Sequence, residues 1–445
     1  MNAVTLSAPV QAVLDRLGDA GFEAYAVGGC VRDCLLGLPP HDGDVTTAAT
    51  PEETMTVFED TPVIPTGLPH GTVTVLMDGV PVEVTTFRTE TTYSDHRHPD
   101  GVAFARSLDD DLARRDFTVN AMAYHPATGL VDRFGGQDDL ARRVIRCVGD
   151  PDTRFAEDAL RILRALRFAS QLDFEIEPAT ADAARRMSGT LAHVSAERLY
   201  AEMTRLLVGP GAGRVLRQFP EVVFEVCPPL RDTFQFDQKN RHHVYDVYEH
   251  ITRTVDAAPA DPVLRWVMLL HDAGKPACFT VDEHGEGHFY GHPAVSARLA
   301  DECLSRLKAD RATRERVVTL VGLHDRQWAL TLPSVKRLLS KLGEPTVRQL
   351  LEVQRADRAG CAPDSGDGEA HEAETRRLIQ EILESEACFR LRDLAVGGDD
   401  LLALGIPAGP AVGQALQRLL ECVIEGSCPN EKTALIKTAR SWYQD

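Results

Sequence analysis

The chain has 445 residues, of which 43% are apolar and 26% are charged. These are the proportions of a globular protein, and the length exceeds what one compact core holds, so we expect about two to four domains. The net charge of −19 excludes a protein coated in positive charge, although nucleic acid could still bind a local basic groove. No run of about 18 apolar residues occurs and the N-terminus lacks signal-peptide features, which predicts a cytoplasmic protein without membrane contact.

The first third of the chain alternates short strand-like runs with turns. After a short amphipathic helix near the N-terminus, AYAV at 24–27 predicts a strand. A glycine pair follows, and then a short helix over 31–36 that a further glycine closes. TVTVLMDGVPVEVTTF at 72–87 predicts a hairpin in which the Asp-Gly pair forms a two-residue turn between alternating arms.

From Pro151 onward the pattern becomes helical almost to the end. Apolar residues recur at three- and four-residue spacing in EDALRILRALRFASQL at 157–172, SAERLYAEMTRLLV at 195–208 and DPVLRWVMLLHDAG at 261–274. The stretch APDSGDGEAHEAE at 362–374 is predicted to be a solvated loop or a short linker. These patterns predict a small α/β head on a long helical body.

Two aspartates in the head, Asp42 and Asp44, stand two residues apart in a stretch expected to be extended, so their side chains leave one face of the strand. Adjacent carboxylates repel each other unless a divalent cation lies between them, and hard oxygen ligands favour Mg²⁺. Glu83, on the second arm of the predicted hairpin, is the candidate for a third carboxylate. Mg²⁺ held in this way can bind triphosphate oxygens and activate an attacking hydroxyl.

A phosphate-binding turn is predicted just before these aspartates. Gly28 and Gly29 precede a helix start, where backbone amides approach phosphates closely, and Arg32 lies one helical step beyond. A glycine pair or an Asp-x-Asp pattern alone also occurs in many proteins without this chemistry. The two patterns in this order indicate a nucleotide site.

The same residues carry a resemblance to a known family. GGCVRDCLLG followed by HDGDVTTAATPEE, within 28–53, resembles the signature of class II CCA-adding enzymes and bacterial poly(A) polymerases, which are tRNA nucleotidyltransferases of the polymerase-β superfamily. The resemblance continues in family order through VEVTTFR at 82–88, LARRDFTVNAMAY at 112–124 and EDALRILRALRFA at 157–169, and reaches the C-terminal helices. It implies an α+β fold, with a small polymerase-β-type head of mixed sheet and helices followed by an elongated all-α neck, body and tail.

The resemblance also implies how nucleotides are chosen. Asp158, Arg161, Arg164 and Arg167 follow one another at three-residue steps, which by itself could be a charged exposed face with an Asp158–Arg161 ion pair. In the family, the matching aspartate and first arginine hydrogen-bond the Watson–Crick edge of the incoming base. A carboxylate that accepts from an amino group and a guanidinium that donates suit C and A, whereas U and G present carbonyls. Arg164 and Arg167 are expected to support this pair or to reach the triphosphate.

Further residues of the head are assigned by the same resemblance. Arg115 matches a family arginine that contacts the sugar or the phosphates, while Asp116 and Asn120 are expected to be structural or on the ribose side. The implied substrates are CTP and ATP, the implied partner is tRNA, and the implied cofactor is Mg²⁺.

Most of the fifteen histidines lie in the C-terminal half, in a pattern that resembles the HD phosphohydrolase superfamily. That pattern is an isolated histidine, a His-Asp doublet and a distant aspartate, with two extra histidines in members that hold two metal ions. The matching residues here are His250, His271, Asp272, His292, His324 and Asp357. Imidazole with carboxylate suits Mn²⁺, Ni²⁺, Fe or Zn²⁺, and Lys275 is expected near a substrate phosphate. Buried histidines that only form hydrogen bonds are the alternative.

The predicted domains are a nucleotidyltransferase head at 1–150, a helical neck for nucleotide selection and RNA binding at 151–235, an HD domain at 236–361 and a tRNA-binding helical tail at 375–445. The predicted function is template-free, Mg²⁺-dependent addition of CCA to the tRNA 3′ end from CTP and ATP, with a second HD phosphohydrolase activity left open. One alternative is a poly(A) polymerase or an enzyme that adds only part of CCA. The other is an HD hydrolase whose head binds RNA.

Overall fold

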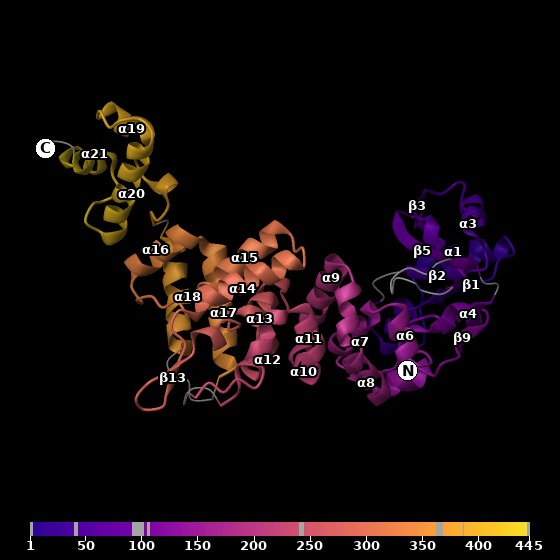
Figure 1. Cartoon of the computed structure of the whole chain (residues 1–445). Coiled ribbons are helices and arrows are strands. Elements are labelled where there is room, and N and C mark those ends of the chain that lie inside the picture. Colours follow the sequence, from indigo (N-terminus) through magenta and orange to yellow (C-terminus); the bar gives the residue numbers. More distant parts are fainter. Residues whose placement is uncertain are drawn as a thin grey trace. The chain divides into compact units, whose positions relative to one another are not determined.

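The computed structural model describes residues 3–39, 43–90, 102–104, 107–239, 244–361, 368–385 and 387–442 (Figure 1). The chain divides into two compact units. The first comprises Met1–Phe234 and Glu302–Arg311, and the second comprises Gln235–Asp301 and Ala312–Asp445.

The head is built on a mixed seven-stranded sheet with the strand order β3-β4-β5-β2-β1-β8-β9. Its strands are β1 Ala24–Val27, β2 Gly43–Thr47, β3 Val63–Gly67, β4 Thr72–Met77, β5 Val80–Thr86, β8 Met122–His125 and β9 Gly129–Asp132. β2 and β5 run parallel, and the other neighbouring pairs are antiparallel. In the described part of the first unit, two short pairs lie outside this sheet, β6 Arg88–Glu90 with β7 Val102–Phe104, and β10 Val144–Ile145 with β11 Glu175–Ile176. The predicted α+β fold is confirmed.

Local sequence signals account for the connections in the head. Its helices are α1 Ala8–Asp19, α2 Gly29–Leu36, α3 Pro51–Val57, α4 Leu108–Ala113 and α5 Gly136–Arg142. The amphipathic α1 buries its apolar face, as expected. In the turn between β4 and β5, Asp78 and Gly79 have φ values of 52° and 79°, which is the left-handed backbone that a tight hairpin requires. The predicted hairpin is therefore confirmed.

The helix expected over 157–172 is interrupted near its start, so this prediction is wrong there. α6 Pro151–Glu157 ends before Asp158, whose backbone is extended, and α7 Leu160–Leu172 begins after it. Leu160 N donates a hydrogen bond to Asp158 Oδ1 at 3.0 Å. A short carboxylate side chain competes for backbone amides in this way, which favours the end of one helix and the start of the next.

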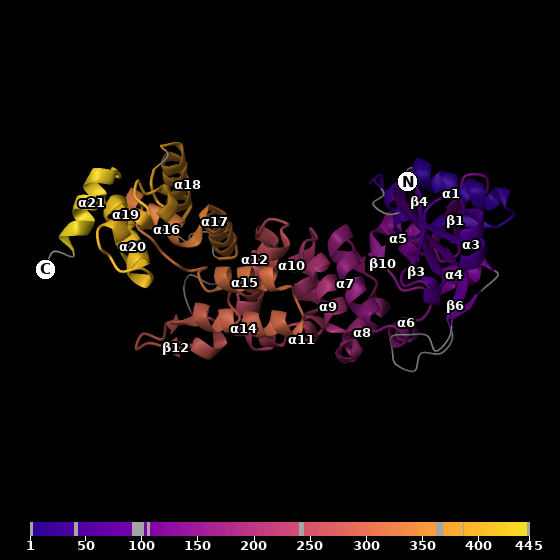
Figure 2. The same cartoon turned by 90° about the horizontal axis from the view of Figure 1, so that it is seen from above.

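The remaining helices are α8 Pro178–Arg186, α9 Ala196–Leu207, α10 Ala212–Gln218, α11 Pro220–Val226, α12 Val247–Ala257, α13 Pro262–Leu270, α14 His292–Arg306, α15 Arg311–Val321, α16 Leu332–Leu342, α17 Glu344–Ala359, α18 Gly368–Glu384, α19 Gly398–Ala403, α20 Pro410–Glu425 and α21 Lys432–Ser441. A short hairpin, β12 Thr280–Val281 with β13 Gly287–His288, precedes α14. Helices α19, α20 and α21 lie together in both views and bury a small core of their own (Figure 1 and Figure 2). None of the helices in the described ranges is long and apolar enough to cross a membrane.

The loop predicted at 362–374 is wrong in its second part, because α18 starts at Gly368. Residues 362–367 lie outside the described residues. Glutamate and alanine, which dominate the start of α18, have good helix propensity, and Arg376 pairs with Glu372 one turn earlier at 2.9 Å. The apolar face that periodicity can detect begins only near Leu378.

Candidate functional site

Asp44 and Glu83 lie side by side on two parallel strands of the head. The register pairs Asp44 of β2 with Glu83 of β5, so the two carboxylates leave the same face of the sheet. Both line a cavity of ≈ 510 Å³. Asp42, the other aspartate of the predicted pair, lies outside the described residues. Two carboxylates at neighbouring positions on one face fit a divalent cation with oxygen ligands.

The turn between β1 and α2 brings the backbone close to this carboxylate. Gly28 has a φ of 71°, a conformation that glycine adopts without strain. A Cβ atom at Gly28 would lie 3.1 Å from Nη1 of Arg115 and 3.7 Å from Oδ2 of Asp44. A glycine is therefore favoured here, and the guanidinium of Arg115 and the carboxylate of Asp44 both lie near it.

Arg32 of α2 is held by neighbouring side chains. Its Nε lies 2.8 Å from Oδ1 of Asp33, and its Nη1 donates to Oδ1 of Asn120 at 2.6 Å. The guanidinium also lies 5.2 Å from the ring centroid of Phe168 on α7. The guanidinium groups of Arg164 and Arg167 also lie over the ring of Phe168. Sequence reasoning missed Phe168, whose only signal was its place directly after the last arginine of the series.

Asp116 joins the head to α7. Nε and Nη2 of Arg164 donate to Oδ2 of Asp116 at 2.9 and 2.5 Å, and Asn120 Nδ2 donates to Oδ1 at 3.3 Å. Burial raises the pKa of Asp116, but the charge and hydrogen bonds of Arg164 outweigh burial and lower the pKa to about 2. This partly buried pair therefore ties α7 to the segment between α4 and β8 and, through Asn120, orients Arg32.

Because the pKa of Asp116 is lower in the folded chain than in the unfolded one, the stability it provides is present above pH about 4 and is lost as the pH falls toward 2. We expect Asp116→Asn to reduce the free energy of unfolding at pH 7 by about 2 kcal/mol. Urea unfolding at pH 7 and pH 3 should show this difference shrinking at the lower pH. Asp152→Asn, which weakens an exposed pair with Arg186, is the control and should change stability by less than about 0.5 kcal/mol.

Asp158 and Arg161 each contact neighbouring groups of the neck and head. Arg198 of α9 donates to Oδ2 of Asp158 at 2.8 Å. Arg161 donates to Oε2 of Glu157 at 2.5 Å and to the backbone oxygen of Arg114 at 3.0 Å. Sequence reasoning missed Arg198 and Glu157, because neither follows the three-residue step of the series.

Arg167 is buried and turned toward α9. Its Nε donates to Oε2 of Glu202 at 2.5 Å, and its Nη1 donates to Gln171 at 2.9 Å. Burial lowers the pKa of Arg167 to about 10, against the opposing charge of Glu202. Of the two roles expected for this arginine, the contacts favour support of the neighbouring residues over direct contact with a triphosphate.

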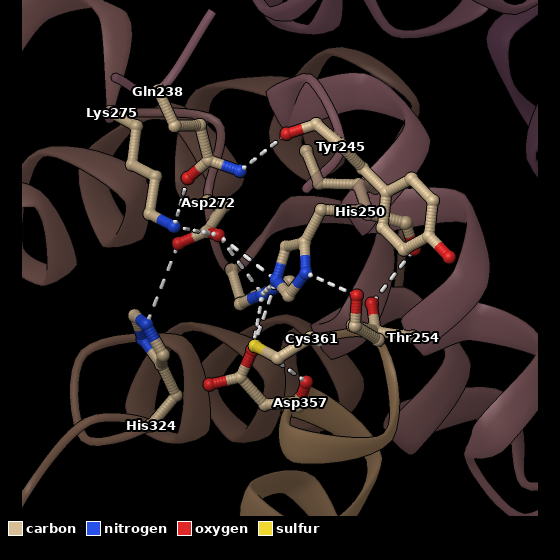
Figure 3. A network of polar contacts seen from close by, with 12 residues as sticks. Gln238, Tyr245, His250, Thr254, Asp272, Lys275, His324, Asp357 and Cys361 are labelled. Carbon is tan, nitrogen blue, oxygen red and sulfur yellow. Dashed lines mark hydrogen bonds and ion pairs between the residues drawn. The ribbon is translucent and has the colours of Figure 1, made fainter. Parts of the chain in front are cut away.

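A second polar cluster lies in the second unit, and Figure 3 shows part of it. It contains all six residues of the predicted HD pattern, namely His250, His271, Asp272, His292, His324 and Asp357. They come from α12, from the end of α13, from the start of α14, from the turn after α15 and from α17. Helices far apart in the sequence therefore bring these side chains to one place.

The cluster has two halves that share Asp272. In the first half, Nε2 of His250 lies 3.2 Å from Nε2 of His271, 3.0 Å from Oδ1 of Asp357 and 3.3 Å from Oδ2 of Asp272. In the second half, Nε2 of His292 lies 3.1 Å from Nε2 of His324 and 3.2 Å from Oδ1 of Asp272. The two oxygens of one carboxylate thus face two different groups of candidate ligands.

In the four histidines of the cluster, the hydrogen bond of Nδ1 determines whether Nε2 of the neutral ring carries a hydrogen. Each Nδ1 lies within hydrogen-bond distance of a backbone carbonyl, at 3.2 Å for His250, 2.8 Å for His271, 2.9 Å for His292 and 2.8 Å for His324. A carbonyl only accepts, so Nδ1 carries the hydrogen and Nε2 of the neutral ring presents a lone pair. Two such lone pairs cannot bond to each other, and either a proton or a metal ion between the paired nitrogens satisfies both.

The electrostatics of the cluster also require positive charge. Burial lowers the pKa of His271, but Asp272 and Asp357 outweigh burial and raise the pKa to about 9. Burial and the charge of His271 lower the pKa of His324 to about 4. The same carboxylates raise the pKa of His250, and buried carboxylates that favour protonated histidines would accept a metal ion in place of the protons.

Two further residues complete the surroundings of the cluster. Nζ of Lys275 lies 2.7 Å from Oδ2 of Asp272 and donates to Oε1 of Gln238 at 2.9 Å (Figure 3). Cys361, four residues after Asp357, lies close enough to His250 and Asp357 to be another metal ligand. Sequence reasoning missed Cys361, although its one-turn spacing from the predicted aspartate was a visible signal.

Three family models match the chain. They are the Poly A polymerase head domain at residues 24–146, the RNA and SrmB-binding site of polymerase A at 173–221, and tRNA nucleotidyltransferase domain 2 at 295–439. None of the three is described as an HD domain.

Relatives and solved structures agree over nearly the full length. The CCA-adding enzyme of Lacticaseibacillus paracasei is 36% identical over 97% of this chain and 96% of its own length, and that of Limosilactobacillus fermentum is 34% identical over 97% and 96%. The crystal structure of the Bacillus stearothermophilus CCA-adding enzyme in complex with CTP has a TM-score of 0.73 and 30% identity, covering 99% of this chain and 98% of that one. The chain therefore belongs to the class II CCA-adding enzymes, the tRNA nucleotidyltransferases that build the CCA end.

Proposed function

We propose that Asp42, Asp44 and Glu83 hold Mg²⁺ in the head while CMP and AMP are transferred from CTP and ATP to the 3′ end of tRNA. The observation that carries this proposal is the register that sets Asp44 beside Glu83 at the wall of a ≈ 510 Å³ cavity. Solved relatives described as complexes with CTP, with ATP and with tRNA support the substrates. Replacing Asp44 by asparagine and measuring the incorporation of CMP and AMP into tRNA lacking CCA tests the metal ligands.

In the proposed reaction the 3′-hydroxyl oxygen of the tRNA attacks the α-phosphorus, the bond from that phosphorus to the bridging oxygen breaks, and pyrophosphate leaves. The hydroxyl proton passes to solvent. Mg²⁺, when bound, offsets the charge of the phosphates and favours loss of the hydroxyl proton. Gly28 lets the backbone approach the phosphates, and Arg115 beside it binds a phosphate or the sugar.

Asp158 and Arg161 select the base in this proposal. Asp158 accepts a hydrogen bond from the amino group of C or A, and Arg161 donates to a ring nitrogen or carbonyl. Arg198 and Glu157 hold the two side chains in place, which reduces the ordering required when a nucleotide binds. Arg164 supports Asp158 and Arg161 by fixing α7 through its ion pair with Asp116.

We expect Asp158→Ala to reduce the preference for CTP and ATP over UTP and GTP by roughly 5- to 150-fold, because one polar base contact provides about 1–3 kcal/mol of discrimination. The measurement is kcat/KM for each nucleotide on tRNA lacking CCA. Asp158→Asn keeps an oxygen that can accept from Leu160 N, and so separates loss of the base contact from loss of the helix cap. If UTP and GTP stay as poorly used as before while CTP and ATP use is intact, Asp158 does not select the base.

Of the alternatives raised from the sequence, CCA addition agrees best with the relatives. CCA-adding enzymes match the chain over nearly its full length, whereas the two models named for polymerase A match residues 24–146 and 173–221. A head that only binds RNA would not need two carboxylates in register beside a phosphate-binding turn.

We further propose that the six-residue cluster is an HD-type centre that binds transition metal ions and hydrolyses phosphate esters. The carrying observation is the convergence of four Nε2 atoms on a shared Asp272. Such metal ions, when bound, provide Lewis-acid catalysis and an activated water. A water oxygen adds to phosphorus, the ester P–O bond breaks, and the alcohol leaves with a proton, while Lys275 binds a phosphate oxygen.

A further inference from the structure

The cluster opens into a cavity of ≈ 380 Å³ whose walls differ in chemistry. One part of the wall carries Lys275 and four of the candidate ligands, which suit a phosphate, namely Asp272, His292, His324 and Asp357. Another part of the wall is the segment from Gly287 to Gly291, which begins with β13 and contains Tyr290. The volume is that of a small-molecule site.

Tyr290 leaves most of its ring uncovered at this wall. Its exposure of 79% is the highest of the large hydrophobic side chains in the described part of the chain. A tyrosine ring with an uncovered face can stack on a partner with a flat face.

The ring of Tyr290 is held in place from one side. It stacks on the ring of His288 with a centroid distance of 5.3 Å and an interplanar angle of 12°. Nε2 of His288 in turn lies 3.0 Å from Oδ2 of Asp282, the residue that directly follows β12. One face of Tyr290 is therefore supported before any ligand arrives, and the other face is free to stack.

The chain path places this ring near the phosphate-binding wall. Gly291, with a φ of 81°, turns the backbone between Tyr290 and the candidate ligand His292. Both residues consequently line the same cavity, together with Lys275. A molecule with an anionic phosphate at one end and a flat aromatic group at the other matches these walls, and a nucleotide has this composition.

We infer that Tyr290, supported by His288, is a specificity-determining residue that stacks on the base of a nucleotide whose phosphate ester is hydrolysed at the cluster. The inference rests on the proposed HD function. It predicts that the centre hydrolyses nucleotides and RNA ends in preference to phosphate esters that carry no base.

The test compares esters with and without a base. Adenosine 3′-phosphate and glycerol 2-phosphate are both monoesters of a secondary alcohol, and only the first can stack. For Tyr290→Ala we expect KM for adenosine 3′-phosphate to rise roughly 5- to 150-fold with kcat nearly unchanged, because stacking on one base is worth about 1–3 kcal/mol. Hydrolysis of glycerol 2-phosphate should not change.

Three matched variants and one binding measurement accompany it. Tyr290→Phe keeps the stacking face and should resemble wild type. His288→Ala removes the support of the ring and should raise the same KM by less than Tyr290→Ala does. Val281→Ala is the control, because it alters an exposed residue of the same hairpin that does not line the cavity. Calorimetric titration should show weaker binding of adenosine 3′-phosphate to Tyr290→Ala with unchanged binding of inorganic phosphate. CMP and AMP addition by each variant reports that the protein is folded.

The outcomes separate the inference from the proposed function. If wild type hydrolyses both esters and Tyr290→Ala changes both equally, or neither, the base-stacking role is wrong and the HD function stands. If wild type binds no transition metal and hydrolyses neither ester, both are wrong.

Discussion

Replacing Asp44 by asparagine should abolish the addition of both CMP and AMP to tRNA. Asp44 is one of two carboxylates set side by side by the β2–β5 register, and loss of its charge weakens the metal site that the reaction needs. A bound metal ion contributes several kcal/mol to phosphoryl transfer, so we expect a fall of at least about 1,000-fold in kcat. The measurement is single-turnover incorporation of labelled CTP and ATP into tRNA lacking CCA at saturating Mg²⁺.

The same experiment has internal controls. tRNA binding by Asp44→Asn should stay within a few-fold of wild type, because the carboxylate serves the metal. Asp60→Asn changes an exposed aspartate of the head that pairs with Arg16, and its activity should equal that of wild type. Asp42→Asn should behave like Asp44→Asn. Retention of a tenth of the wild-type rate in Asp44→Asn would exclude Asp44 as a metal ligand.

The parts of the head that could be predicted from the sequence are those with local signals. The strand at Ala24–Val27, the helix that Gly37 closes and the Asp78-Gly79 hairpin all follow from alternation and turn residues, and all are present. The proximity of Asp44 to Glu83 is different in kind. It depends on the parallel pairing of β2 with β5, two strands that are separated along the chain. No local pattern in either strand specifies the other as its neighbour.

The wrong predictions also have physical reasons. Periodicity alone continued the helix through Asp158, because spacing records which face is apolar and not where a side chain caps a backbone amide. The partners of the arginine series, such as Asp116 for Arg164 and Glu202 for Arg167, come from segments 48 and 35 residues away. In the histidine cluster the residue types could be matched by resemblance, whereas the sharing of Asp272 between two halves required the helix packing.

Replacing Asp272 by asparagine should remove metal binding from the cluster and leave CCA addition nearly unchanged. Asp272 offers one oxygen to His250 and His271 and the other to His292 and His324, so the loss of its charge affects both halves. The cluster lies in the second compact unit and Asp44 lies in the first, and sites that share no partner act nearly independently. Transition-metal content and metal-stimulated phosphoesterase activity should fall by at least about 10-fold, while kcat for nucleotide addition stays within about two-fold.

The controls and chemistry of the two sites make this result decisive. His284→Ala removes an exposed histidine whose side chain is 81% accessible and should change neither activity nor metal content. The double variant His271→Ala with Asp272→Ala should give the same separation as Asp272→Asn. Chelation followed by Mg²⁺ alone should restore nucleotide addition, whereas Mn²⁺, Ni²⁺, Fe²⁺ or Zn²⁺ is needed for the cluster, since carboxylates favour the hard ion and imidazoles the softer ones. Loss of nucleotide addition in a folded Asp272→Asn protein would show that the cluster takes part in the transferase reaction. If wild-type protein binds no transition metal, the histidines of the cluster only form hydrogen bonds.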